Sequence, residues 1–142
     1  MRWANLTTIG VGAVVVAGMM AINYHGVKVM QDQSDRVYLW LYGSAIYEYH
    51  NQTGKWPSKI EDLAGTSLPR QNPDWKIQLD IQADVIVWPK DLRPSPEDNG
   101  QRILVYHNKG VDVEVGRIWV CWGDLRTECI TPEELRGRLK QQ

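Results

Sequence analysis

Residues 6–22 read LTTIGVGAVVVAGMMAI, at the centre of a run from Trp3 to Val27 that contains no Asp, Glu, Lys or Arg. An α-helix rises about 1.5 Å per residue, so about 20 apolar residues span the hydrocarbon core of a bilayer. Trp3 and Tyr24 stand near the two ends of the run, where amphipathic aromatic side chains prefer the membrane interface. We therefore expect residues 1–27 to form a single-pass anchor in the lipid bilayer of the cell membrane.

A cleaved signal peptide is the alternative interpretation of this run. Such a peptide has a basic amino-terminal region and small residues one and three positions before the cleavage site. Arg2 is the only basic residue ahead of the run, and Met19 stands two positions before Ala21. The sequence therefore favours a retained anchor.

Small residues follow one face of the predicted anchor. Gly10, Ala13 and Ala17 recur at spacings of three and four, which places them close together on a helix. Small side chains let another helix approach closely inside a bilayer, although Gly and Ala are also frequent in membrane spans generally. These three residues are the predicted contacts with other membrane proteins.

Residues 28–142 are enough for one small extramembrane domain. The net charge is −1 and the 16 Lys and Arg are scattered, which argues against a nucleic-acid partner. The charges that flank the run are nearly balanced, so the positive-inside rule does not fix its orientation.

The helical pattern continues beyond the run and then gives way to strand patterns. Apolar or small residues recur at spacings of three and four, which predicts an amphipathic helix over 28–51, continuous with the anchor and ending before Gly54 and Pro57. The residues of this expected inner stripe are Val27, Met30, Ser34, Val37, Leu41 and Ala45. Ser58 with Glu61 predicts a short capped helix that ends at Gly65.

Alternation of apolar and polar residues predicts a half-buried strand over 75–82, WKIQLDIQ. Apolar, β-branched segments predict further strands over 84–88, 102–107 and 116–122, and a tight turn at 123–126 leads back into TECI. A last helix is announced by Thr131 as N-cap, Pro132 at the first helical position and Glu134. The domain is thus predicted to be α+β, a long helix followed by a small antiparallel sheet with short flanking helices.

Two cysteines, Cys121 and Cys129, lie on either side of the predicted turn. A three-residue turn centred on Leu125 would place them opposite each other, whereas a two-residue turn at Asp124 and Leu125 would pair Cys121 with Glu128. A disulfide between them would indicate an oxidising compartment. Two reduced, buried thiols fit the sequence equally well.

No pattern in the sequence predicts an enzyme. His25, His50 and His107 are far apart and have no metal-ligand spacing, and the phosphate-loop, nucleophile-elbow and zinc-protease motifs are missing. We therefore predict no catalytic residue, no cofactor, no metal and no small-molecule substrate.

Two groups of acidic residues call for separate interpretations. Asp32, Asp35 and Glu48 fall on the polar face of the predicted helix, where a solvated face is expected. The proline-rich loop over 89–100 holds the carboxylates that would be candidates for calcium, namely Asp91, Glu97 and Asp98. Their spacing is not that of an EF-hand.

Two stretches resemble type II secretion pseudopilins and related prepilin-like proteins. Residues 45–63, AIYEYHNQTGKWPSKIEDL, resemble the segment in which a tyrosine-bearing helix ends at Gly, a Pro follows and a short helix carries a leucine. Residues 116–135, GRIWVCWGDLRTECITPEEL, look like the last hairpin of these proteins, with Asp124 at the turn and Leu125 in place of Gly. The resemblance implies a hydrophobic stalk with a small head on the extracytoplasmic, periplasmic side.

Two functional hypotheses follow. The first is a non-enzymatic, pseudopilin-like component of a secretion or pilus-type assembly. The apolar run contains no Glu, which pilin-type precursors carry near the start of the mature chain. We therefore also consider a second hypothesis: the chain is an accessory subunit that stabilises a large integral membrane complex, photosynthetic or respiratory. Both predict other membrane proteins as partners.

Overall fold

The computed structural model describes residues 33–82, 84–108 and 116–142. The predicted anchor over 1–27 lies outside the described residues. So do its interfacial and packing positions Trp3, Tyr24, Gly10, Ala13 and Ala17. Within the described ranges, the structure contains no helix that is both long and apolar enough to cross a bilayer. The compact unit that holds the sheet spans Asp35–Gln142.

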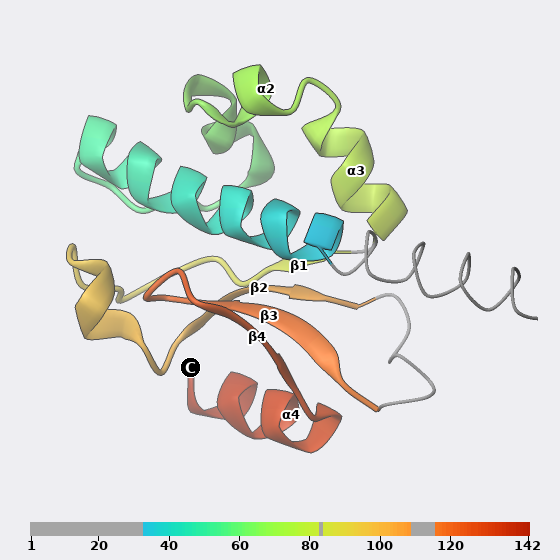
Figure 1. Cartoon of the computed structure of the whole chain (residues 1–142). Coiled ribbons are helices and arrows are strands. Elements are labelled where there is room, and N and C mark those ends of the chain that lie inside the picture. Colours follow the sequence, from blue (N-terminus) through green and yellow to red (C-terminus); the bar gives the residue numbers. More distant parts are fainter. Residues whose placement is uncertain (1–32, 83, 109–115) are drawn as a thin grey trace, which may run out of the picture. The chain divides into compact units, whose positions relative to one another are not determined.

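The fold of this unit is α+β, as predicted (Figure 1). The chain is helical over 33–53. The elements that follow are η1 (Ile60–Gly65), α2 (Leu68–Gln71), α3 (Trp75–Gln82), β1 (Asp84–Ile86), η2 (Pro96–Asn99), β2 (Ile103–His107), β3 (Ile118–Trp122), β4 (Thr127–Ile130) and α4 (Pro132–Gln141). The four strands form one antiparallel sheet in the order β1-β2-β3-β4.

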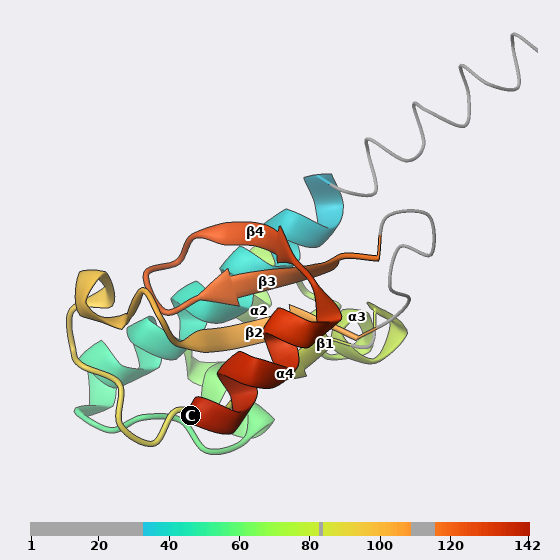
Figure 2. The ribbon, with the colours of Figure 1, turned by 90° about the horizontal axis from the view of Figure 1, so that it is seen from below.

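Helices cover both faces of the sheet. The 33–53 helix lies across one face and α4 lies against the other (Figures 1 and 2). Because successive residues of a strand point to opposite faces, β3 supplies both cores. Cys121 belongs to the core under the long helix, whereas Val120 and Trp122 belong to the core under α4, together with Leu135.

A bulge in β2 sends two consecutive residues into the same core. The pairing with β3 shifts between Ile103 and Val105, and both Leu104 and Val105 pack under the 33–53 helix. A bulge takes a residue out of the ladder. The side-chain amide of Gln142 hydrogen-bonds both backbone groups of Ile103, at 3.1 Å from its N–H to Oε1 and 3.1 Å from Nε2 to its carbonyl oxygen. The end of the chain is thereby tied to the start of β2.

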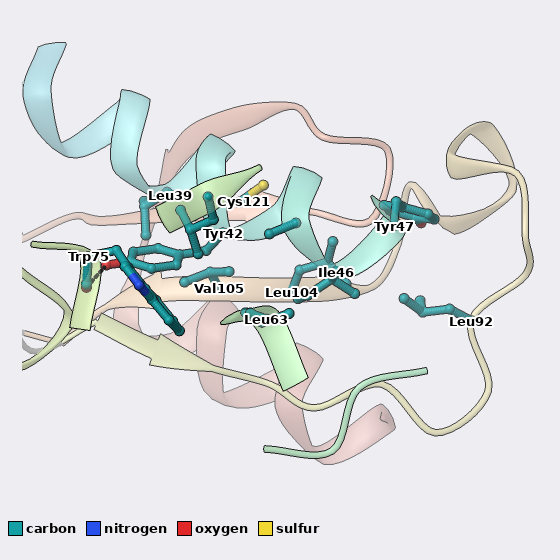
Figure 3. Close-up of a cluster of buried hydrophobic side chains, with 12 residues drawn as sticks. Leu39, Tyr42, Ile46, Tyr47, Leu63, Trp75, Leu92, Leu104, Val105 and Cys121 are labelled. Atoms are coloured by element: carbon teal, nitrogen blue, oxygen red, sulfur yellow. Dashed lines mark hydrogen bonds between the residues drawn. The ribbon is translucent and has the colours of Figure 1, made fainter. Parts of the chain in front are cut away.

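The long helix lies close to β3 at Gly43. A Cβ at this position would lie 2.8 Å from Sγ of Cys121 and 3.2 Å from Cδ2 of Leu125. Tyr42 and Ile46, on either side of Gly43, are fully buried (Figure 3). The helix can lie this close only because residue 43 has no side chain.

The inner face of this helix agrees with the prediction in part: Leu41 and Ala45 of the expected stripe pack on the core, and Val27 and Met30 lie outside the described residues. Leu39, Tyr42 and Ile46 face the core, whereas Val37, expected on the inner stripe, is 55% exposed. The physical reason is that residues 37–47, VYLWLYGSAIY, carry no charge, so apolar residues lie on every face. Hydrophobic spacing alone then cannot choose the inner face, and the close approach at Gly43 does.

Two acidic residues of this helix do not lie on a solvated face, contrary to the prediction. Asp35 is only 9% exposed. The carboxylate of Glu48 accepts hydrogen bonds from the N–H of Ser67 at 2.8 Å and from its hydroxyl at 2.6 Å. Glu48 thereby fixes the start of α2 against the long helix.

The segment 75–82 is the helix α3 and not the predicted strand. Trp75 and Leu79, one helical turn apart, pack on the core, while Ile77 is 58% exposed. A period-two pattern also contains residues at spacing four, and these can share a helical face. The hydroxyl of Tyr42 donates to the carbonyl oxygen of Trp75 at 2.7 Å, so a contact distant in sequence holds the start of α3 (Figure 3).

The predicted ends of the helices are mostly confirmed. Gly54 has φ +71° and its N–H donates to the carbonyl oxygen of His50 at 2.8 Å. The hydroxyl of Thr131 accepts from the N–H of Glu134 at 3.2 Å. The expected pairing of Ser58 with Glu61 is wrong, because Asp62 accepts the N–H of Ser58 at 2.8 Å, which lowers the pKa of the Asp62 carboxyl.

We predict that Gly43→Ala destabilises the fold by about 1–3 kcal/mol, the usual cost of extra volume in a packed core. Urea unfolding followed by circular dichroism measures this cost. Gly137→Ala is the matched control, because a Cβ there meets nothing within 4 Å. Alanine favours helix over glycine by about 0.5–1 kcal/mol, so the control should be neutral or more stable. Equal effects at both positions would contradict the close approach.

Candidate functional site

The two stretches that carry the resemblance meet at a buried hydrogen-bond cluster. The hydroxyl of Tyr47, on the 33–53 helix, donates to the carbonyl oxygen of Gly123 in the β3–β4 turn at 2.6 Å. The same hydroxyl accepts from Nδ2 of Asn99, the last residue of η2, at 2.8 Å. We call Tyr47, Asn99 and Gly123 the tyrosine junction. Tyr47 lies at the end of the core remote from Trp75 (Figure 3).

Asn99 organises the loop that enters the junction. Its Nδ2 also donates to the carbonyl oxygens of Arg93 at 2.8 Å and Ser95 at 2.9 Å. Its Oδ1 accepts from the N–H of Arg93 at 3.0 Å. Asn99 itself is buried, and its partners Arg93 and Ser95 lie in the loop that it organises. One amide side chain therefore sets the path of residues 93–99.

Gly123 lets the turn and the loop touch. A Cβ at Gly123 would lie 2.5 Å from both Cβ and the backbone oxygen of Asn99. The N–H of Gly123 donates to the carbonyl oxygen of Arg102 at 2.7 Å. Any side chain at this position would have to displace backbone. The junction therefore depends on a glycine that the sequence reading assigned only to a turn.

The carboxylates of the 89–100 loop do not converge on a cation site. Asp91 forms an ion pair with Arg102 at 2.5 Å. Glu97 accepts a hydrogen bond from the hydroxyl of Ser95, which lowers the pKa of its carboxyl. Over the described ranges, no three His, Cys, Asp or Glu side chains form a group that could hold a metal ion. The loop is built around the Asn99 amide.

The cysteines lie in a register that neither sequence alternative predicted. Cys121 pairs with Thr127 and Cys129 with Trp119, because the turn is centred on Asp124. Leu125 adopts φ +66°, the left-handed conformation for which glycine was expected. No disulfide joins the two cysteines. Burial, and then the charge of Asp124, raise the pKa of the Cys121 thiol to about 12.

Of the three histidines, His50 and His107 make contacts within the fold, and His25 lies outside the described residues. His50 stacks on Trp56 with ring centroids 3.9 Å apart. Nδ1 of His107 lies 2.8 Å from Oδ1 of Asp84, directly across β1 and β2. These contacts join neighbouring elements, and the two histidines lie in different parts of the fold.

A cavity of about 160 Å³ lies between the segment after β1 and the end of α4. Its walls are mainly apolar, and they include Val87, Leu104 and Leu139. The charged groups at the cavity include Asp91 and Arg102, which are already paired with each other. The cavity therefore offers no set of convergent polar groups of the kind that orients a substrate.

An apolar surface runs along the outward side of the 33–53 helix. Val37 is 55% and Trp40 is 46% exposed, whereas Leu41 is partly buried and packs against the core under the helix. We call Val37 and Trp40 the outer stripe. The nearest preceding charge, Arg36, is held with its guanidinium 5.2 Å from the ring centroid of Trp119. The sequence prediction placed Val37 on the inner face and so missed this surface.

Comparisons with protein-family models, curated proteins and solved structures find no match to this chain. The resemblance to prepilin-like proteins therefore rests on the residues that carry it.

We predict that Tyr47→Phe destabilises the fold by about 1–3 kcal/mol, because it leaves the buried carbonyl oxygen of Gly123 without its donor and removes one of the three acceptors around Asn99 Nδ2. Denaturant unfolding at pH 7 measures the loss. Tyr49→Phe is the matched control, since Tyr49 is partly buried on the same helix and lies outside the junction. Similar losses for both variants would show that the tyrosine junction is not a special contact.

The Tyr47 side chain should also make the fold less stable at alkaline pH. Burial raises the pKa of Tyr47 from 10.0 to about 12. The stabilisation that depends on neutral Tyr47 is thus complete below pH 10 and is lost as the pH rises towards 12. The unfolding free energy of Tyr47→Phe should fall less steeply than that of the unsubstituted chain between pH 9 and pH 11. Tyr42 and Cys121, whose pKa values burial also raises, should supply the remaining slope.

We expect Cys121 to resist alkylation in the folded protein at pH 8, because it is buried and its thiolate is scarce below its raised pKa. Iodoacetamide labelling with and without denaturant, followed by peptide mass spectrometry, measures this. Cys129, which is only partly buried, serves as the internal comparison. Rapid labelling of native Cys121 would contradict its burial. Protection of both cysteines that only a reductant removes would show a disulfide.

Proposed function

We propose that this chain is a non-enzymatic, single-pass membrane-anchored structural protein, a pseudopilin-like component of a secretion or pilus-type assembly. The observation that carries the proposal is the long helix. The uncharged run Trp3–Val27 leads within a few residues into a helix over 33–53 that lies along a four-stranded antiparallel sheet. This is the order of elements that the resemblance implies.

The tyrosine junction supports the same proposal. The two stretches that resemble prepilin-like proteins, over 45–63 and 116–135, are far apart in sequence. The hydrogen bond from Tyr47 to Gly123 joins the two stretches in the fold, although these two residues are 76 positions apart in the sequence. If the two stretches resembled prepilin-like proteins only by coincidence, they would have no reason to contact each other. If the whole head shares the architecture of these proteins, such a contact is expected.

The use of the charged side chains is also consistent with a structural role. Glu48 fixes the start of α2, Asp62 caps η1 and Asp91 holds Arg102 beside the loop. In each case the carboxylate satisfies backbone groups or a neighbouring cation. These contacts serve the stability of the head.

The second candidate is an accessory subunit of a large integral membrane complex. The outer stripe favours it, because exposed apolar side chains on a helix suit a fixed protein neighbour. Under this proposal the anchor and the head would be held by partner subunits.

We predict that the full chain, expressed in its own cells, stays in the membrane fraction after alkaline carbonate washing. A variant with Val14→Arg and Val15→Arg should be released, because each arginine at a span centre costs about 2.5–3.5 kcal/mol on insertion scales. Release of the unsubstituted chain would refute both candidates.

Intact mass and co-purification in mild detergent then separate the two candidates. A mass short of a leader, together with a secretion ATPase and platform proteins, is expected of a pseudopilin-like component. A full-length mass at fixed stoichiometry within an integral complex is expected of an accessory subunit.

A further inference from the structure

The helix α4 covers one face of the sheet with few apolar side chains (Figure 2). Five of its ten residues are charged, and its leucines, Leu135 and Leu139, pack on the core beneath it. Ion pairs such as that of Arg136 with Glu133, at 3.1 Å, join residues of the same helix and not the helix to the sheet. A helix of this length is only marginally stable alone, so its position depends on its contacts with the sheet.

Two further features lower the stability of α4 on the sheet. A Cβ at Gly137, in the middle of the helix, would meet nothing within 4 Å, so no close contact requires this helix-weakening residue. In the core beneath, Trp122 is 2% exposed, and its Nε1 has no hydrogen-bond partner among the described residues. A buried N–H without a partner costs free energy, which contact with water would recover.

Gln142, the C-cap of α4, makes a two-bond contact between the end of the helix and the sheet. β1 ends at Ile86, and the N–H of Val87 still donates to the carbonyl oxygen of Leu104. At the next residue of β2, Ile103, the carboxamide of Gln142 accepts from the N–H and donates to the carbonyl oxygen, at 3.1 Å each. A residue of a neighbouring antiparallel strand would make the same pair of bonds.

The packing around this contact is incomplete. The cavity of about 160 Å³ has Leu139, Gln142 and Ile103 among its lining residues. A further polar contact of the last turn, from Arg138 to Gln101, is exposed to solvent. Since close packing is what normally prevents an element from moving, the two bonds of Gln142 become important for the position of the helix end.

We propose that α4 opens from the sheet as a unit while the rest of the head stays folded, and that Gln142 is the residue that holds it closed. The hinge is Thr131, which lies between β4 and α4. No member of the buried core under the 33–53 helix belongs to α4, so that core and the tyrosine junction stay intact in the open form. Opening uncovers the sheet face that carries Val120, Trp122 and Ile130.

Native-state hydrogen exchange of the full chain in mild detergent tests the proposal, with mass spectrometry of peptides from α4 and β3. We expect protection factors in α4 to be at least about tenfold lower than in β3, because segments with few buried apolar contacts open locally. Exchange of α4 should also depend less on urea, since its opening exposes less surface than unfolding of the head. Equal protection and equal urea dependence in both elements would overturn the proposal.

The role of Gln142 is measured with adjacent substitutions. Gln142→Ala should lower the protection of α4 at least about threefold, because both bonds to Ile103 are lost. Gln141→Ala is the matched control, since Gln141 is exposed on the same turn, and it should leave the protection of α4 unchanged. Gly137→Ala should raise this protection by about two- to fivefold, because alanine stabilises the helix. Equal effects of the two glutamine substitutions would refute the holding role of Gln142.

Tyr47→Phe distinguishes opening of α4 from unfolding of the whole head. This substitution weakens the tyrosine junction, which the open form keeps. The protection of β3 should therefore fall while the protection of α4 stays unchanged. A parallel fall in both elements would mean that α4 leaves the sheet only when the head unfolds, and the proposal would be wrong.

Discussion

The fold depends on the absence of a side chain where the long helix crosses β3. Gly43 lies directly over Cys121, and Tyr47, one turn later, reaches Gly123, two residues further along the chain. Four helical residues rise about 6 Å and two strand residues about 6.6 Å, so the two elements stay in step. This match fixes both the rotation and the sliding position of the helix on the sheet. The buried positions of Tyr42 and Ile46 and the exposed position of Val37 are consequences of it.

Local signals in the sequence predicted those parts of the fold that local chemistry controls. Gly54 ends the long helix in the left-handed conformation, and Thr131 caps α4 with its own hydroxyl. The α+β class also follows from local patterns. Residues 75–82 were assigned wrongly, because alternation is equally compatible with a helix whose core side chains are Trp75 and Leu79. The hydrogen bond from Tyr42 to Trp75 ties the start of this segment to the long helix, and it joins residues that are 33 positions apart in the sequence.

The tyrosine junction could not be predicted, because each of its members has an ordinary local explanation. Tyr47 reads as one aromatic residue in an apolar helix, and Asn99 and Gly123 read as loop and turn residues. Their joint role arises from contacts over 24 to 76 residues of sequence. The register of the cysteines was missed for a related reason, since a left-handed leucine at position 125 has no sequence signal. The β3–β4 turn thus contains both Asp124, which matches the hairpin of prepilin-like proteins, and Leu125, which stands where those proteins have Gly.

Asn99 also has a chemical consequence for the lifetime of the protein. It precedes Gly100, and in a flexible chain an Asn-Gly step deamidates readily, because glycine leaves its backbone nitrogen open to the asparagine amide. In the folded head the amide of Asn99 is held by Tyr47, Arg93 and Ser95. Folding therefore protects the side-chain amide of Asn99 from deamidation. Conversion to aspartate during a local opening would replace the donor with an acceptor that faces the carbonyl oxygens of Arg93 and Ser95, and would therefore disfavour the return of the loop to its folded position.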